Sequence, residues 1–171
     1  MKEQDTGKID ASQDIVASIL MNRPAIEAAI PHRDPFLFLD AIVEADEGSL
    51  CAIWRTPENA DWVKGHFPGR PVVPGVLVSE HVFQACAVLI SRNLKGFSAE
   101  DGIPVLTKIE QARFRSMVIP GDTLTTNVKV DERLGPAWYM SAVVTCGSKT
   151  VVKLRCVLSA SEALARATGG A

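Results

Sequence analysis

The segment Gly75–Asn93 constrains the fold of this chain more than any other feature. The segment is predicted to form a helix with apolar residues on nearly every side. Such a helix must be buried on most of its faces. Segments with the alternating apolar and polar pattern of β-strands lie before and after it. They span residues 36–45, 48–56, 105–116, 124–131, 138–146 and 152–158. An α+β architecture, with an antiparallel sheet wrapped around one long central helix, accommodates all of these elements.

Length and composition exclude several classes of protein. The chain has 171 residues, a formal net charge of −2 and 47% hydrophobic residues. This length predicts a single domain over residues 14–160, between a flexible N-terminal tail (1–13) and a C-terminal tail (161–171). The apolar content excludes disorder of the bulk of the chain, and the near-neutral charge argues against nucleic-acid binding. No apolar run reaches the ~18–20 residues of a membrane span, and the polar N-terminus does not resemble a secretory signal, so we expect a cytoplasmic protein.

The cysteines give no sign of a metal site or a disulfide framework. Cys51, Cys86, Cys146 and Cys156 are widely separated, without a C-x-x-C pair or a nearby His. Zinc sites require closely spaced ligands of these types. The sequence therefore predicts reduced thiols among apolar neighbours, and no metal.

A possible acid–base pair lies around the start of the central helix. His66 stands in a loop stiffened by three prolines, and Glu80 and Gln84 share one face of the helix. A neutral His can act as a general base, and a carboxyl group held protonated by apolar surroundings can act as a general acid. The N–H of Gly75, at the helix N-terminus, suits a polarised or anionic oxygen.

Each of these residues also has a structural interpretation. His66 can be a loop histidine bonded to the backbone, Glu80 can be a buried acid paired with an arginine, and the proline loop can be a simple turn. The residues alone leave both interpretations open.

Three motifs identify a family that this chain resembles. The segment GHFPGRPVVPGVLVSEHVFQ is similar to the signature of 3-hydroxyacyl-[acyl-carrier-protein] dehydratases of the FabZ type. That signature is HFPG, a basic residue, Pro, two apolar residues, PGV, an apolar stretch ending in Glu, and Gln one turn later. IPHRDPFLFLDAIVE resembles the family's opening motif, and KIEQARFRSMVIPGDTL resembles its later strand and turn. The motifs occur in the family's order and cover most of residues 30–125.

The resemblance implies the hot-dog fold and a specific reaction. The expected reaction is dehydration of (3R)-3-hydroxyacyl-[acyl carrier protein] to the trans-2-enoyl form, in fatty acid or specialised lipid biosynthesis. The substrate is carried on the phosphopantetheine of acyl carrier protein, and the reaction uses no cofactor. The family also implies a homodimer with active sites at its interface, or a trimer of such dimers. In each site the His and the Glu come from different subunits.

Roles follow for the residues that match the family motif. His66 is expected to remove the C2 proton, Glu80 to protonate or orient the leaving hydroxyl, and the Gly75 N–H to hold the thioester carbonyl. The other residues expected to contact the substrate are Phe67, Pro74, Val76 and Gln84, with Leu77 and Phe83 along the acyl tunnel.

Basic residues are candidates for docking the acidic carrier protein. They are Arg70, Lys108, Arg113 and Arg115. Each of them can equally be an ordinary solvated surface charge.

The chain departs from the family pattern at two places. His81 follows Glu80 where the family commonly has a small residue. Helical geometry turns it about 100° away from Glu80, so we expect a packing role. Val105 and Leu106 stand where family members often carry aromatic residues that gate the tunnel.

Other activities of the same fold remain as alternatives. A hot-dog acyl thioesterase would drive water onto the same carbonyl and release a free acid. A non-catalytic subunit would bind the carrier without turnover, but it would not need Glu80. A relative that also isomerises the double bond typically uses Asp in place of the Glu.

Overall fold

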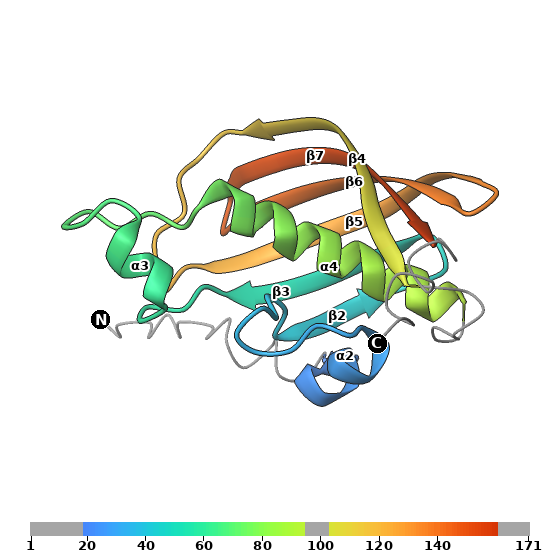
Figure 1. The fold of residues 1–171 in the computed structure, drawn as a ribbon, viewed down its shortest axis with the longest axis horizontal. Coiled ribbons are helices and arrows are strands. Elements are labelled where there is room, and N and C mark those ends of the chain that lie inside the picture. The colour runs from blue at the N-terminus through green and yellow to red at the C-terminus, as the bar shows by residue number, and fades with distance from the viewer. Residues whose placement is uncertain (1–18, 95–102, 161–171) are drawn as a thin grey trace, which may run out of the picture.

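The central helix of the protein is the one that the sequence predicts. The computed structural model describes residues 19–94 and 103–160, and helix α4 (Gly75–Asn93) lies against one side of a curved sheet (Figure 1). Residues on most faces of α4 are buried, among them Val82, Val88 and Leu89, which are completely inaccessible to solvent. The apolar pattern of the segment is thereby explained.

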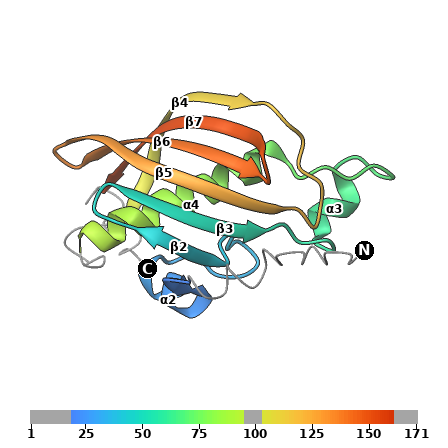
Figure 2. The ribbon, with the colours of Figure 1, turned by 180° about the vertical axis from the view of Figure 1, so that it is seen from behind.

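A seven-stranded antiparallel sheet wraps around α4 (Figure 2). In spatial order the strands are β1 (Met21–Asn22), β2 (Ala41–Ala45), β3 (Ser49–Arg55), β5 (Thr123–Leu134), β6 (Ala137–Cys146), β7 (Lys149–Ala160) and β4 (Pro104–Phe114). All neighbouring strands are antiparallel. Among the described residues, the strand that follows α4 in sequence, β4, is therefore an edge strand that pairs with β7 alone. The predicted α+β architecture is confirmed.

Alternation along the strands builds the core. In β7, Val152, Leu154 and Cys156 are buried, whereas Lys153 and Arg155 between them are exposed. Because side chains alternate between the two faces of a strand, one face of β7 packs toward α4 and the other meets solvent. The four cysteines are free, and three of them are buried, as the sequence predicts.

The structure corrects the strand expected over residues 36–45. Only Ala41–Ala45 pairs as β2, in a hairpin with β3. In the connection before it, Leu37, Phe38 and Leu39 are all buried, which strict alternation does not allow. The reason is that side chains of α4, and not a neighbouring strand, bind the backbone of residues 36–38.

The described residues also contain two short helices. Helix α2 (Arg23–Ala29) is capped by the side chain of Asn22, which accepts a hydrogen bond from the Ala25 N–H, and α3 (Asp61–Gly65) leads into the proline loop. None of the described helices meets the length and hydropathy needed to cross a membrane. The tails predicted at residues 1–13 and 161–171 lie outside the described residues.

Candidate active site

His66 is held in one tautomer by the proline loop. It ends α3, where its N–H donates to the Trp62 carbonyl, and its Nδ1 lies 2.7 Å from the Val72 carbonyl oxygen. A carbonyl only accepts, so Nδ1 carries the hydrogen. In the neutral ring Nε2 is then unprotonated, and it makes no hydrogen bond with any residue that the structure describes. The loop therefore presents a nitrogen that can take a proton.

The backbone of the next residue is strained. Phe67 has a φ of 64°, in the left-handed region that residues with a side chain rarely adopt. Its ring lies 4.3 Å from the His66 ring, and its carbonyl accepts from the Arg70 N–H in a tight turn. Such strain persists only where the surroundings enforce it, and it concentrates at functional sites.

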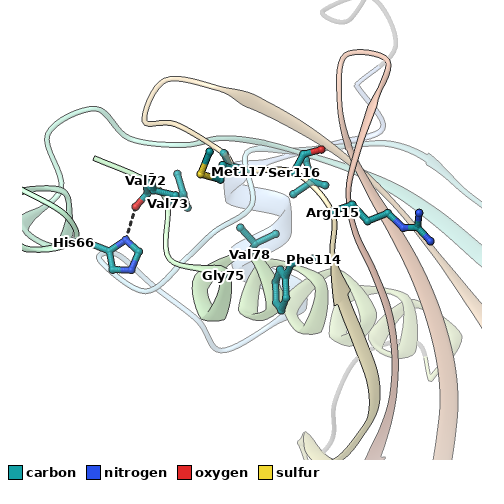
Figure 3. Close-up of a pocket in the computed structure, with 11 residues that line it drawn as sticks. His66, Val72, Val73, Gly75, Val78, Phe114, Arg115, Ser116 and Met117 are labelled. Atoms are coloured by element: carbon teal, nitrogen blue, oxygen red, sulfur yellow. Dashed lines mark hydrogen bonds between the residues drawn. The ribbon is translucent and has the colours of Figure 1, made fainter. Parts of the chain in front are cut away.

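An apolar pocket of about 360 Å³ opens beside His66 (Figure 3). Its lining comes from the proline loop, the start of α4, the end of β4 with the segment after it, and the start of β7. The lining residues are His66, Val72, Val73, Gly75, Val78, Phe114, Arg115, Ser116, Met117, Val118 and Val151. The amides of Gly75 and Val76 are the first of α4, and neither has a hydrogen-bond acceptor within the described part of the chain. They are placed to bind an oxygen at the positive end of the helix.

Position 75 has little room for a side chain. A Cβ built on Gly75 would lie 3.0 Å from Cε1 of Phe114, tighter than most real Cβ contacts, so the Phe114 ring would have to shift by a few tenths of an ångström. Glycine therefore lets the Phe114 ring pack closely over the first turn of α4. The absence of a side chain also leaves the Gly75 amide accessible from the pocket.

Glu80 has different surroundings. Its Oε1 accepts a hydrogen bond from Gln84 Nε2 at 3.0 Å and lies 3.6 Å from His32 Nε2. Burial is the main cause that lowers the pKa of His32, with Glu80 opposing and Arg33 adding to the effect. His32 is therefore neutral at neutral pH, and among the residues that the structure describes no arginine pairs with Glu80.

Gln84 is fully buried and makes three hydrogen bonds within the protomer. Its Oε1 accepts from the Phe38 N–H at 2.8 Å, and its Nε2 donates to the Phe36 carbonyl and to Glu80, each at 3.0 Å. The substrate contact that the sequence predicts for Gln84 stays a prediction, and the structure places its amide in a network that holds Glu80.

His66 and Glu80 do not meet in one protomer. Val78 faces the pocket that contains His66, but Glu80 does not line it. Two residues further along a helix correspond to a rotation of about 200°, so Glu80 points to another side of α4. The two residues therefore occupy separate surroundings within the protomer.

The other residues expected to bind substrate lie around the N-terminus of α4. Pro74 is its N-cap residue, and its carbonyl accepts from the amides of Leu77 and Val78. Val76 is 74% exposed and Phe67 is 58% exposed. Leu77 and Phe83, by contrast, are half-buried and pack against the core.

The four basic residues expected to dock a carrier protein do not form one cluster. Arg115 lines the pocket, although Figure 3 shows its guanidinium pointing away from His66. Arg70 is exposed in the proline loop, between His66 and Val72 of the lining. Arg113 lies opposite Lys153 and therefore faces away from α4. Lys108 lies six residues before Phe114 along β4, roughly 20 Å away at ~3.3 Å per residue, and contacts Glu110 at 3.1 Å.

Several residues of the site were missed from the sequence. His32 and the backbone of Phe36 and Phe38 surround Glu80 and Gln84, and Phe114 covers Gly75. All of them lie inside the motifs IPHRDPFLFLDAIVE and KIEQARFRSMVIPGDTL, so the motifs were the available signal. The residues described contain no group of three or more His, Cys, Asp or Glu side chains arranged to bind a metal ion.

Comparison with known proteins decides the family. A family model described as a FabA-like domain matches residues 30–155. The chain belongs to the FabA-like family. It is 35% identical over 144 residues to a 3-hydroxyacyl-[acyl-carrier-protein] dehydratase FabZ of Anaeromyxobacter sp. (strain Fw109-5), covering 83% of this chain and 91% of the relative. It is 42% identical over 123 residues to the FabZ of Staphylococcus aureus (strain JH9), covering 70% of this chain and 81% of that protein. The family resemblance read from the motifs is confirmed.

The fold of this FabA-like chain also has solved counterparts. The dehydratase heterocomplex ApeI:P from Xenorhabdus doucetiae matches with a TM-score of 0.69 at 13% identity, over 84% of this chain and 97% of that one. At this identity the match concerns the fold alone. The hot-dog fold predicted for the chain is confirmed.

Proposed function

We propose that this chain catalyses the dehydration of (3R)-3-hydroxyacyl-[acyl carrier protein] to trans-2-enoyl-[acyl carrier protein] in fatty acid or specialised lipid biosynthesis. The observation that carries the proposal is His66, held with Nε2 free beside the first amides of α4 in an apolar pocket. The identity to curated FabZ dehydratases supports the same reaction.

The chemistry needs an acid, a base and a stabilised oxygen. His66 Nε2 removes the C2 proton, and the electrons of that bond move toward the thioester carbonyl. The Gly75 N–H and the positive end of α4 stabilise the negative charge on that oxygen. Glu80 gives a proton to the C3 hydroxyl, which leaves as water while the double bond forms. No electrons are gained or lost overall, so the reaction requires no redox cofactor.

We propose that a second copy of the chain completes each site. Strand β4 is a long edge strand, and almost all of its residues are exposed. Met117 (75% exposed) and Phe114 (52%) are exposed beside the pocket, as is Val76 on the first turn of α4. A long edge strand with exposed apolar side chains is a ready pairing surface. The proposed homodimer uses this surface to bring Glu80 of one protomer to His66 of the other, and such dimers can assemble as a trimer of dimers.

The remaining predicted residues divide by location. Phe67, Pro74 and Val76 lie around the start of α4 and are proposed to contact the thioester and the acyl chain. Arg70 and Arg115 are proposed to meet the acidic carrier protein near the pocket, with Arg113 and Lys108 more distant. A cytoplasmic location is proposed because free cysteines are typical of a reducing compartment.

The experiment is an assay of enoyl-thioester formation from carrier-bound 3-hydroxyacyl substrates of graded length. We expect turnover by the parent and a loss of about a hundredfold or more in kcat for His66→Ala and Glu80→Gln, since general acid–base catalysis contributes on this scale. Glu132→Gln, an exposed acid on β5, is the matched control and should keep full activity. Full activity of either site variant contradicts the proposal, and release of free acid in place of the enoyl product supports the thioesterase.

A further inference from the structure

His81 is a buried polar residue that the proposed reaction does not use. It follows Glu80 on α4 and is completely inaccessible to solvent. Its Nδ1 lies 2.7 Å from the Phe38 carbonyl oxygen, and its Nε2 lies 2.6 Å from Thr126 Oγ1 on β5. Since the carbonyl only accepts, Nδ1 donates to it, and Nε2 accepts from the threonine hydroxyl. Both nitrogens are satisfied by the neutral ring.

The backbone of Phe38 is bound from two sides by one helix. His81 binds its carbonyl, and Gln84, three residues later on α4, binds its N–H. That second bond fixes the orientation of the Gln84 amide, because only its oxygen can accept from an N–H. The amino group of Gln84 is thereby directed to the Phe36 carbonyl and to Glu80.

The segment of residues 32–38, whose Phe38 carbonyl His81 binds, also contains His32, which lies beside Glu80. His32 precedes Phe38 by six residues, and its Nε2 lies 3.6 Å from Glu80 Oε1. Both contacts of the carboxylate therefore depend on the path of residues 32–38. Thr126, itself fully buried, ties this path to the sheet through His81.

We propose that His81 is a positioning residue for Glu80, acting through the Phe38 backbone and Gln84. The inference rests on the proposed function, because Glu80 is the group that is positioned. Removal of the imidazole leaves the Phe38 carbonyl without its hydrogen bond, and the Gln84 amide is then held less firmly. The Glu80 carboxyl group can therefore turn away from the orientation in which it reacts. Catalysis is sensitive to such displacements, since about 1 Å of misplacement can cost a hundredfold in rate.

The test compares His81→Leu and His81→Asn with Val88→Ala, a buried core change on the same helix. Leucine fills the space but bonds neither Phe38 nor Thr126, whereas the amide nitrogen of asparagine can still donate to the Phe38 carbonyl. We expect His81→Leu to lower kcat about tenfold or more with KM within about twofold. His81→Asn should recover most of this loss, and Val88→Ala should keep the parent kcat at temperatures where it is folded.

A second measurement does not depend on activity. The Phe38 amide should be protected from hydrogen exchange in the parent, and about tenfold less protected in His81→Leu than in Val88→Ala. If the parent exchanges as expected but forms no enoyl thioester, the proposed function fails while the structural link from His81 to Gln84 stands.

Thr126→Val tests the same link where His81→Leu does not fold. It removes the hydroxyl behind His81 and suits a strand, and it should shift kcat and Phe38 exchange in the same direction by a smaller factor. The proposal is overturned if His81→Leu, or Thr126→Val in its place, keeps kcat and Phe38 protection at parent levels. It is equally overturned if Val88→Ala loses as much kcat as His81→Leu.

Discussion

The two sides of α4 that carry the proposed catalytic residues are built differently. Around Glu80 the protomer is closed, because side chains of the same protomer surround the carboxylate. Gln84, which is fully buried, and His32 are both in contact with it. Around His66 the protomer is open: within the described ranges the ring hydrogen-bonds to Val72 alone, and apolar side chains such as Met117 stay exposed. The Glu80 side is held by hydrogen bonds of the protomer itself, whereas the His66 side is the one on which we propose that a second copy packs.

Substitution on the closed side should produce the largest effect on stability. Gln84→Leu leaves the Phe38 N–H and the Phe36 carbonyl without their partner, at a cost of about 2–4 kcal/mol in the free energy of unfolding. It should also lower kcat, because Glu80 loses its hydrogen bond. Urea denaturation and the dehydration assay measure the two effects. A Gln84→Leu variant as stable and as active as the parent would break the contrast between the two sides.

The closed side should also make stability depend on pH. Desolvation lowers the pKa of His81 from its ordinary 6.5 to about 4, opposed in part by the hydrogen bond to Phe38. The unfolded chain therefore binds the proton more tightly than the folded chain, so stability is complete above about pH 6.5. It decreases as the pH falls toward 4, by about 3 kcal/mol in total.

His32, whose pKa is also lowered, adds to this loss with the same sign. Asp46, whose pKa is lowered by hydrogen bonds from Gly48 and Ser49, affects stability only below its ordinary value of 3.8. Denaturation at a series of pH values measures the slope, and His81→Asn should remove most of it. If the free energy of unfolding of that variant depends on pH as in the parent, the pH dependence arises from other groups.

Substitution on the open side should weaken association and leave the fold intact. Met117→Asp places a charge on an exposed apolar position beside the pocket. Burying that charge in a dimer should raise the dissociation constant about tenfold to a hundredfold. Unfolding of the monomer should change by less than about 0.5 kcal/mol, as for other surface positions. Light scattering over a concentration series gives the oligomeric state, and an unaltered dimer would remove this surface from the interface.

The smallest effect is expected for the basic residues proposed to dock the carrier protein. Arg115→Glu, near the pocket, should raise KM for the carrier-bound substrate about threefold at low salt, with less effect at high salt. Arg113→Glu is the matched control, because Arg113 faces away from α4 beside Lys153. Equal effects of the two substitutions would mean that docking does not depend on distance from the pocket.

Much of the fold was predictable because its signals are local. The apolar pattern of α4 gives its bounds, and alternation gives β5, β6 and β7 to within a few residues. Residues 36–40 were assigned to a strand because alternation cannot reveal a backbone that is bound by side chains of a distant helix. Phe38 and Gln84 are 46 residues apart in sequence.

Site residues could be predicted where their residue type and their position in a motif are enough to assign a role. His66, Glu80 and Gly75 follow from the signature GHFPGRPVVPGVLVSE. The tautomer of His66 was not predictable, since it depends on the carbonyl of Val72. The positions of His32 and His81 relative to Glu80 required the packing of the loop after α2 against α4.

The central claim is that each site combines His66 of one protomer with Glu80 of another, and mixing two inactive variants tests it most directly. His66→Ala and Glu80→Gln are each purified, mixed in equal amounts, dissociated and reassociated, and assayed for dehydration. In a twofold dimer, each mixed pair contains one site with both residues intact, so about a quarter of the parent activity should return. Recovery on this scale supports the shared site. Mixed dimers, verified by mass, that remain as inactive as either variant alone would contradict it.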